Sequence, residues 1–487
     1  MKRIIGVFVA LALVGAPLAS ARPADPVYVA VGDGSSVKGS LEQVGHDPLM
    51  NRGMNAALAV RGDYAYVGSR TDGLHPNAGI MVVDVSDPAQ PAAVGQIGPA
   101  NRGETSREMR IWPERDLLIV QFLASNCSFL IHACSPEQMT KDDVFRFYDI
   151  AGEKAAAPEL IAEYVPSQNP HEFYLWQDPK DPKRALLYLS TPGGSDQMMV
   201  TDISDARSGK FTEVAKWKTL IPEPGDNRLH SLSVSPDGTR AYIAYLQGGF
   251  FIVDTSDLAA GRSKPEIKTV TPIPDRTAWE GPGAHSAVKL FGKPYALVTD
   301  EVYGQIPVLL ADHGCPWGWT RLINIKDPAK PKVVAEYKTE ANDPKYCESA
   351  ENDPARNALS SQAAHNPTLT KNLAFITWHS QGLQAISLKN PAKPVQVAEF
   401  VPTPEPFVIQ EDPVLSSGRD KVVMWSYPVI QDGLIYVVDV RNGLYILRYK
   451  GPFSAEVSST RFLEGNSNLG DALRFDAPKL AKSSTRI

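Results

Sequence analysis

Four histidines share one local setting, each directly before a short apolar run that has the character of a β-strand. The segments are "PHEFYLW" (170–176), "LHSLSV" (229–234), "AHSAVKL" (284–290) and "AHNPTL" (364–369), and they contain His171, His230, His285 and His365. Neutral imidazole nitrogens are ligands for iron, copper, manganese and zinc. If the four segments are equivalent strands of a repeated fold, the side chains converge. We therefore predict that these histidines bind a divalent transition metal (Fe, Cu, Mn or Zn).

Other polar side chains near these strands are suited to act on a substrate. His379 and Tyr245 each follow an apolar run, "LAFIT" (373–377) and "AYIA" (241–244), and are candidates for a general base or acid. Arg107 holds, in its own repeat, the place that the histidines hold in theirs, and it is a candidate clamp for an anionic substrate group. Glu301, like Glu172 and Glu280, can orient a ring nitrogen from behind. We predict that the catalytic residues are His379, Tyr245, Arg107 and Glu301.

A structural interpretation stands beside each of these assignments. Duplicated repeats inherit the same residue, so a ring of histidines can also line a water-filled channel. Arg107 can pair with its neighbour Glu108, and His379 can be an ordinary loop residue. The remaining histidines share no register, and we interpret them as surface or loop residues: His46, His75, His132 and His313.

The chain around these residues is a repeat. One phrase recurs as "IMVVDVSDPAQP" from residue 80, "MMVTDISDARSG" from 198 and "FFIVDTSDLAAG" from 250, with four more divergent copies. Two short strands precede each copy and one follows it, without helical periodicity. Seven such units predict an all-β fold, a seven-bladed β-propeller of four-stranded antiparallel blades. The aspartate of the phrase is expected to have a structural role, with hydrogen bonds either within a turn or between blades.

The last unit lacks an outer strand after Lys450. The segment "SLEQVGHDPLMNRG" (40–53) parallels "AAVGQIGPANRG" (92–103), so we predict that this N-terminal strand completes the last blade and closes the ring. When the seven units are aligned, one position opens every innermost strand. The residues at this position are Asn55, Arg107, His171, His230, His285, His365 and Ser426.

In these phrases the chain resembles the LVIVD-repeat proteins, which are exported β-propellers. The resemblance covers nearly the whole mature chain and implies the fold, but it implies no particular chemistry. Two more distant similarities concern the general plan. Carotenoid-cleavage-type dioxygenases are propellers that hold iron with four axial histidines. The selenium-binding/methanethiol oxidase family shares phrases like "IKDPAKPKVV" and "NPHEFY", although its cysteine-bearing motif is absent here. Both analogies imply only that the four histidines bind a metal.

The N-terminus and the cysteines predict an exported protein. Residues 1–21 have the basic start, apolar stretch and small-residue ending of a signal peptide, with cleavage after Ala21. Residues 22–455 form the predicted propeller and residues 456–487 a C-terminal tail. The four cysteines allow three pairings, of which Cys127–Cys134 and Cys315–Cys347 are favoured. We expect a periplasmic or secreted protein without a membrane span.

These features leave two classes of function open. The net charge of −6, with both signs interspersed, argues against nucleic acid as a partner. The first hypothesis is a metal-dependent enzyme: an oxidoreductase on a small organic molecule, or alternatively a metal-assisted lyase or hydrolase on an anionic saccharide. The second is a non-catalytic propeller that binds a protein or a glycan. The sequence identifies neither the substrate nor the oligomeric state.

Overall fold

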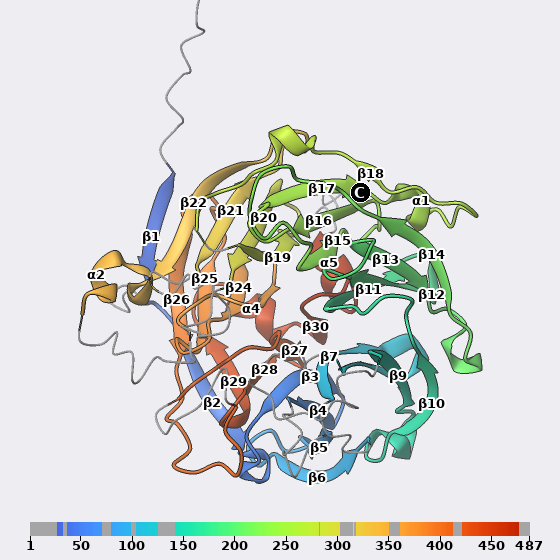
Figure 1. Ribbon diagram of the computed structural model, residues 1–487. Helices are drawn as coiled ribbons and strands as arrows, with labels where there is room; N and C mark the ends of the chain where they lie inside the picture. Colours follow the sequence, from blue (N-terminus) through green and yellow to red (C-terminus); the bar gives the residue numbers. More distant parts are fainter. Residues whose placement is uncertain are drawn as a thin grey trace, which may run out of the picture.

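A computed structural model shows seven β-sheets arranged around a central axis (Figure 1). This confirms the predicted seven-bladed propeller. The structure describes residues 27–32, 37–70, 79–98, 104–124, 142–281, 283–301, 315, 318–349, 361–412 and 421–476. The statements below refer to these residues.

Each blade is a four-stranded antiparallel sheet, named here from its innermost to its outermost strand. Blades 1 to 3 contain β3 (Asn55–Arg61), β4 (Tyr64–Ser69), β5 (Ile80–Asp84) and β6 (Ala92–Ile97); β7 (Thr105–Trp112), β8 (Leu117–Leu123), β9 (Val144–Asp149) and β10 (Glu159–Tyr164); and β11 (Glu172–Asp178), β12 (Asp181–Ser190), β13 (Met198–Asp202) and β14 (Thr212–Trp217). Blades 4 and 5 contain β15 (Ser231–Val234), β16 (Arg240–Ala244), β17 (Phe250–Asp254) and β18 (Lys268–Thr269); and β19 (Ala284–Lys289), β20 (Tyr295–Asp300), β21 (Thr320–Asn324) and β22 (Lys332–Thr339). Blade 6 contains β23 (Pro367–Leu369), β24 (Leu373–Thr377), β25 (Leu383–Ser387) and β26 (Val395–Phe400).

The third strand of most blades is the apolar part of the repeated phrase. In β5, β13 and β17 the first four residues are buried and the final aspartate is partly exposed. The carboxylates of Asp84, Asp202 and Asp254 each accept a hydrogen bond from the backbone N–H two residues later, at 2.8–2.9 Å. The phrase recurs because its apolar residues are buried between neighbouring blades and its aspartate side chain accepts a hydrogen bond within the turn that follows, as predicted.

The N-terminal strand closes the ring as predicted. Blade 7 is built from β27 (Val429–Gln431), β28 (Leu434–Asp439), β29 (Gly443–Lys450) and, as its outer strand, β2 (Ser40–Asp47). The β2–β29 pairing is antiparallel and runs from Ser40 opposite Lys450 to Asp47 opposite Leu444. A further strand, β1 (Tyr28–Gly32), adds in parallel to β22 at the outer edge of blade 5. Two N-terminal strands therefore add to the outer edges of two different blades, β1 to blade 5 and β2 to blade 7.

The segment after blade 7 returns to the innermost strands, near the centre of the ring in Figure 1. Strand β30 (Phe462–Glu464) pairs with β27. The side-chain amides of Asn466 and Asn468 donate to the carbonyls of Phe173 and Gln177, at 2.6 and 2.8 Å. Both acceptors lie within β11, beyond its first residue. The segment thus contacts the innermost strands away from the end at which the histidines lie.

Helices are few and short in the described part of the chain. They are α1 (Ser256–Ala259), α2 (Pro344–Cys347), α4 (Ser454–Ser458) and α5 (Ala472–Asp476). Among the described residues, no helix has the length and apolar character required to cross a membrane.

Candidate metal centre

The repeat places three of the predicted histidines in one register. The backbone N–H groups of His171, His230 and His365 donate to the last carbonyl of the second strand in their own blade, which belongs to Ser190, Ala244 or Thr377 (2.7–3.0 Å). His285 lies where the β19–β20 pairing shifts register between Ala284 and Ser286. The predicted equivalence of these positions is therefore present in the backbone of blades 3, 4 and 6, whereas His285 of blade 5 lies at a bulge.

The imidazole rings form a continuous row. Neighbouring ring centroids are 4.4 Å apart for His171–His230, 4.0 Å for His230–His285 and 4.1 Å for His285–His365. His379 extends the row at 4.9 Å from His365. His285, His365 and His379 are fully buried, and His230 is 9 % exposed. Four of the five rings are thus buried, whereas the His171 ring is partly exposed.

Glu301 and His379 occupy a second repeated position, the turn after strand two. The residues before them, Asp300 and Trp378, donate their backbone N–H to the carbonyl that precedes strand three, as Tyr245 does in blade 4. The blade 4 equivalent of Glu301 and His379 is therefore Leu246. Both Leu246 (φ 39°) and His379 (φ 28°) have a left-handed backbone, so this conformation belongs to the repeat and not to the histidine.

The Glu301 carboxylate lies among three histidines. One oxygen, Oε1, lies 2.9 Å from Nε2 of His365 and 3.6 Å from Nε2 of His379. The other, Oε2, lies 3.3 Å from Nε2 of His285. Nε2 of His285, Nε2 of His365 and Oε1 of Glu301 are buried and have no hydrogen-bond partner among the described residues. A bound cation would satisfy these atoms together, so the donor set fits a transition metal.

Neighbouring residues fix which nitrogen of two rings carries the proton. Nδ1–H of His365 donates to the carbonyl of Trp425 at 2.6 Å. Asn366 donates its amide to the same carbonyl at 3.1 Å, which turns its Oδ1 toward the Ser286 hydroxyl (3.0 Å). Because Ser286 donates to Asn366, it accepts from Nδ1–H of His285 (2.8 Å). Nδ1 therefore carries a proton in both rings, and the nitrogen that can ligate a metal in each neutral ring is Nε2.

Burial also favours the neutral form of the His171, His230, His285 and His379 rings. It lowers the pKa of His230 and of His379 to about 3 and the pKa of His285 well below its usual 6.5. Burial, with a smaller effect of Arg107, lowers the pKa of His171 in the same direction. Neutral rings have a lone pair to donate, so they are in the ligand form at physiological pH.

Arg107 lies at the His171 end of the row. Its Nη2 donates to Nε2 of His171 at 2.8 Å and lies 3.6 Å from a carboxylate oxygen of Glu172. Its guanidinium is 5.0 Å from the ring centre of Trp425. The buried Nε of Arg107 has no hydrogen-bond partner among the described residues. The predicted anion clamp is thus beside the histidines and has a donor available.

Glu172 is a second carboxylate at the cluster. Its Oε1 is 3.7 Å from Nε2 of His285 and 3.9 Å from Nδ1 of His230. Burial, followed by the neighbouring charge of Glu108, raises the pKa of Glu172 to about 8. From the sequence, Glu172 was predicted only to orient a histidine ring, as one of three carboxylates with that possible role. The third of these, Glu280, is exposed.

Tyr245 lies elsewhere. It packs in an apolar cluster between blades 3 and 4, and its hydroxyl donates to Gln197 and to the carbonyl of Thr219. Its described hydrogen bonds reach none of the histidines, and burial raises its pKa to about 12. Tyr245 corresponds to Trp378 in the repeat, whereas the residue that corresponds to His379 is Leu246. The sequence alignment paired Tyr245 with His379, whereas the backbone hydrogen bonds pair Leu246 with His379. This difference of one residue explains why Tyr245 lies away from the histidines.

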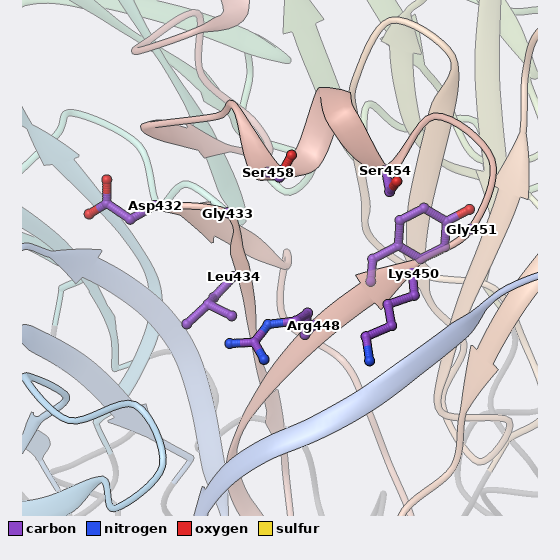
Figure 2. A pocket seen from close by; sticks show the side chains of 9 residues that line it. Asp432, Gly433, Leu434, Arg448, Lys450, Gly451, Ser454 and Ser458 are labelled. Atoms are coloured by element: carbon purple, nitrogen blue, oxygen red, sulfur yellow. The ribbon is translucent and has the colours of Figure 1, made fainter.

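Figure 2 shows a separate surface pocket of about 420 Å³ on blade 7, beside α4. Its lining contains no histidine and consists of Asp432, Gly433, Leu434, Arg448, Tyr449, Lys450, Gly451, Ser454 and Ser458. Lys450 forms an ion pair with Glu42 at 2.7 Å. This pocket is thus not part of the histidine cluster.

One predicted disulfide is present. Cys315 and Cys347 are bonded, which confirms that pairing. Cys315 packs beside Ala363, two residues before His365. Cys127 and Cys134 lie outside the described residues, as does the predicted signal peptide.

Comparison with known proteins identifies LVIVD repeats in two parts of the chain. The LVIVD repeat family profile matches residues 52–97 and 230–265, and no curated protein matches the chain. Similar solved structures include Sqt1 from Chaetomium thermophilum, with 12 % identity over 87 % of this chain and 89 % of that chain (TM-score 0.46). Raptor from the same organism has 10 % identity over 85 % and 30 % of the chains (TM-score 0.46). The β-propeller domain of Cps50 (Swd1) from Myceliophteria thermophila has 8 % identity over 84 % and 98 % (TM-score 0.45).

At this level of similarity the solved structures carry no argument about function. The repeated phrase, the matched repeats and the seven blades agree with one another. The chain contains LVIVD repeats and folds as a seven-bladed β-propeller.

Proposed function

We propose that this propeller is a metal-dependent enzyme, an oxidoreductase that acts on a small organic molecule at its histidine cluster. One observation carries the proposal: His285 and His365 are fully buried and aim Nε2 atoms, which have no hydrogen-bond partners among the described residues, at the Glu301 carboxylate. An unsatisfied buried polar group costs about 1–3 kcal/mol. Several such atoms at one point favour a bound cation over simple packing.

The proposed ligands come from the two repeated positions. His230, His285 and His365 open innermost strands, and Glu301 and His379 follow second strands. When bound, iron, copper or manganese would supply redox chemistry, and zinc would supply Lewis acidity. The chain's own part is to hold the donors in place: Trp425 and Ser286 hold the protons on Nδ1 of His365 and His285, so that both Nε2 atoms stay available.

The His171 end is the proposed substrate side. His171 is partly exposed, and its Nε2 already accepts a hydrogen bond from Arg107. Metal binding through this nitrogen competes with that hydrogen bond. We therefore place His171 and Arg107 toward the substrate, where the unpartnered Nε of Arg107 would bind an anionic group such as a carboxylate.

Export is part of the proposal. Disulfides persist in oxidising compartments, and the Cys315–Cys347 bond supports the periplasmic or secreted location that the N-terminal residues predict. The Glu301 site would then take its metal either before export or from the surroundings.

The test is the metal content of the mature protein, produced with export. We expect a transition metal to co-purify, or to bind on reconstitution, and to be lost in a His285→Ala/His365→Ala double variant. His46→Ala is the matched control, because His46 bonds the carbonyl of Asn442 outside the row. A folded protein that binds no transition metal would contradict the proposal and favour the non-catalytic protein- or glycan-binding propeller.

A further inference from the structure

The two oxygens of Glu301 face different histidines. Oε1 is the oxygen near Nε2 of His365 and His379, at 2.9 and 3.6 Å. Oε2 is the oxygen near Nε2 of His285, at 3.3 Å. A carboxylate that binds one cation through a single oxygen leaves the other oxygen for a hydrogen-bond donor. Here the second oxygen also faces an unprotonated nitrogen.

The donors around Glu301 divide into two sets. One set contains Glu301, His365 and His379, and the other contains Glu301, His230 and His285; within each set all ligand atoms lie within 4.8 Å of one another. The two sets share Glu301 alone. Ligands of one transition metal ion lie at about 2.0–2.2 Å from it, so two of its ligand atoms are at most ~4.4 Å apart. The bound of 4.8 Å for each set lies just above this limit, so a small movement of the side chains would bring each set around one ion.

A second carboxylate is available to the His230–His285 set. Oε1 of Glu172 lies 3.7 Å from Nε2 of His285, and both Glu172 oxygens are buried. Arg107, whose positive charge opposes a nearby cation, contacts His171 and Glu172 at the end of the row. No contact of Arg107 with Glu301, His365 or His379 occurs among the described ion pairs and hydrogen bonds.

We propose that the cluster holds two divalent metal ions side by side, bridged by the Glu301 carboxylate. His365 and His379 bind one ion through Oε1 of Glu301. His230 and His285 bind the other through Oε2, with Glu172 as a further ligand. Two ions bridged in this way would each stabilise one of the two oxygen atoms that react at the site. The inference rests on the proposed function, since it concerns the same site.

The experiment measures metal stoichiometry and spin coupling on the full mature chain. The metal-free protein is loaded with Cu²⁺, dialysed, and analysed by elemental analysis and by electron paramagnetic resonance. Ions in two-metal sites lie about 3.5–4 Å apart, close enough for their spins to couple. We expect two copper ions per chain and a resonance intensity well below the copper content.

Two paired variants assign the positions. His365→Ala/His379→Ala and His230→Ala/His285→Ala are each expected to retain one copper ion, with resonance intensity now equal to copper content. Glu301→Gln is expected to weaken both. His46→Ala should keep two coupled ions. Circular dichroism and urea unfolding establish that each variant folds, and the wild-type stoichiometry and coupling test the proposal without any variant.

The possible outcomes distinguish a failure of the two-ion site from a failure of the metal centre itself. One ion per wild-type chain, with full resonance intensity, would overturn the second position while the metal-dependent function stands. Two uncoupled ions, or two ions that both survive in either paired variant, would overturn the bridged arrangement. No copper binding at all would overturn the metal centre itself.

Discussion

Glu301 and His365 come from neighbouring blades, yet Oε1 of Glu301 lies 2.9 Å from Nε2 of His365, and neither atom has a hydrogen-bond partner among the described residues. Nδ1 of the same His365 ring donates to the Trp425 carbonyl, so in the neutral ring the lone pair of Nε2 faces Glu301. A lone pair and a carboxylate oxygen at this distance repel one another unless a metal ion joins them or a proton on Nε2 makes the contact an ion pair. This contact is the centre of the proposed site.

Glu301→Gln tests the contribution of the negative charge. Glutamine keeps the shape of the side chain but removes one carboxylate oxygen and the charge, so we expect metal affinity to fall by at least 10- to 100-fold. Titration against a chelator of known affinity measures the change. Glu266→Gln is the control, because Glu266 is exposed and pairs only with Lys268 among the described contacts. Equal affinities for wild type and Glu301→Gln would exclude Glu301 as a ligand.

Asn366→Ala tests the residues that fix the His285 proton. Without Asn366, the Ser286 hydroxyl can rotate and donate to Nδ1 of His285, which moves the ring proton to Nε2. We expect metal affinity to fall about 10- to 100-fold. Asn372→Ala is a matched control in blade 6. The side-chain amide of Asn372 also donates a partly buried hydrogen bond, but its acceptor is the Glu456 carboxylate.

Measurements of unfolding free energy and of metal affinity distinguish a structural role of Asn366 from its role in fixing the His285 proton. Both asparagine variants should lose stability by about 1 kcal/mol or more in urea unfolding. Only Asn366→Ala should change the pH at which metal binding reaches its midpoint. If both variants bind metal like the wild type, Asn366 is a structural residue alone.

The sequence alone predicts the propeller because its repeat is strongly constrained. Each phrase combines an apolar strand, buried between blades, with a turn closed by Asp84 or its equivalent, and this pattern survives divergence. The outer strand at Ser40–Asp47 was predictable because it repeats the pattern of another outer strand. The histidine row was predictable for the same reason, since it follows the repeat register.

The rest of the site depends on contacts that the repeat does not encode. Glu301 and His379 were predicted as site residues, but the sequence does not show that the blade 4 residue at their position is Leu246. The roles of Ser286 and Asn366 depend on hydrogen-bond directions between blades 5, 6 and 7. Tyr245 falls one residue from the position that faces the cluster, a difference that the backbone hydrogen bonds define.

Removal of the Cys315–Cys347 bond should destabilise the fold. The bond spans 32 residues, and closing a loop of this size stabilises a protein by about 2–4 kcal/mol. A Cys315→Ser/Cys347→Ser variant should therefore unfold at lower urea concentration than the wild type. The wild type in a reducing buffer should shift toward the variant. An unchanged unfolding midpoint in the variant would show that the loop is held without the bond.

Glu464 should make stability fall as the pH rises. Burial raises its pKa to about 8, above its usual 4.5, although the charge of Arg110 opposes the shift. Between these two values the folded chain keeps a proton that the unfolded chain has released, so stability decreases with increasing pH across this window and levels off above it.

A Glu464→Gln variant isolates this group, because glutamine imitates the protonated carboxyl at every pH. We expect wild type and variant to have similar unfolding free energies near pH 4.5, and the variant to become the more stable of the two as the pH approaches 8. Urea unfolding of both proteins across this range measures the difference, in which all other titrating groups cancel. Arg110 retains Glu108 as an ion-pair partner at 3.0 Å in the variant, so its charge is still compensated. A difference that is constant with pH, or that grows toward acid, would mean that Glu464 is ionised in the folded protein and paired with Arg110.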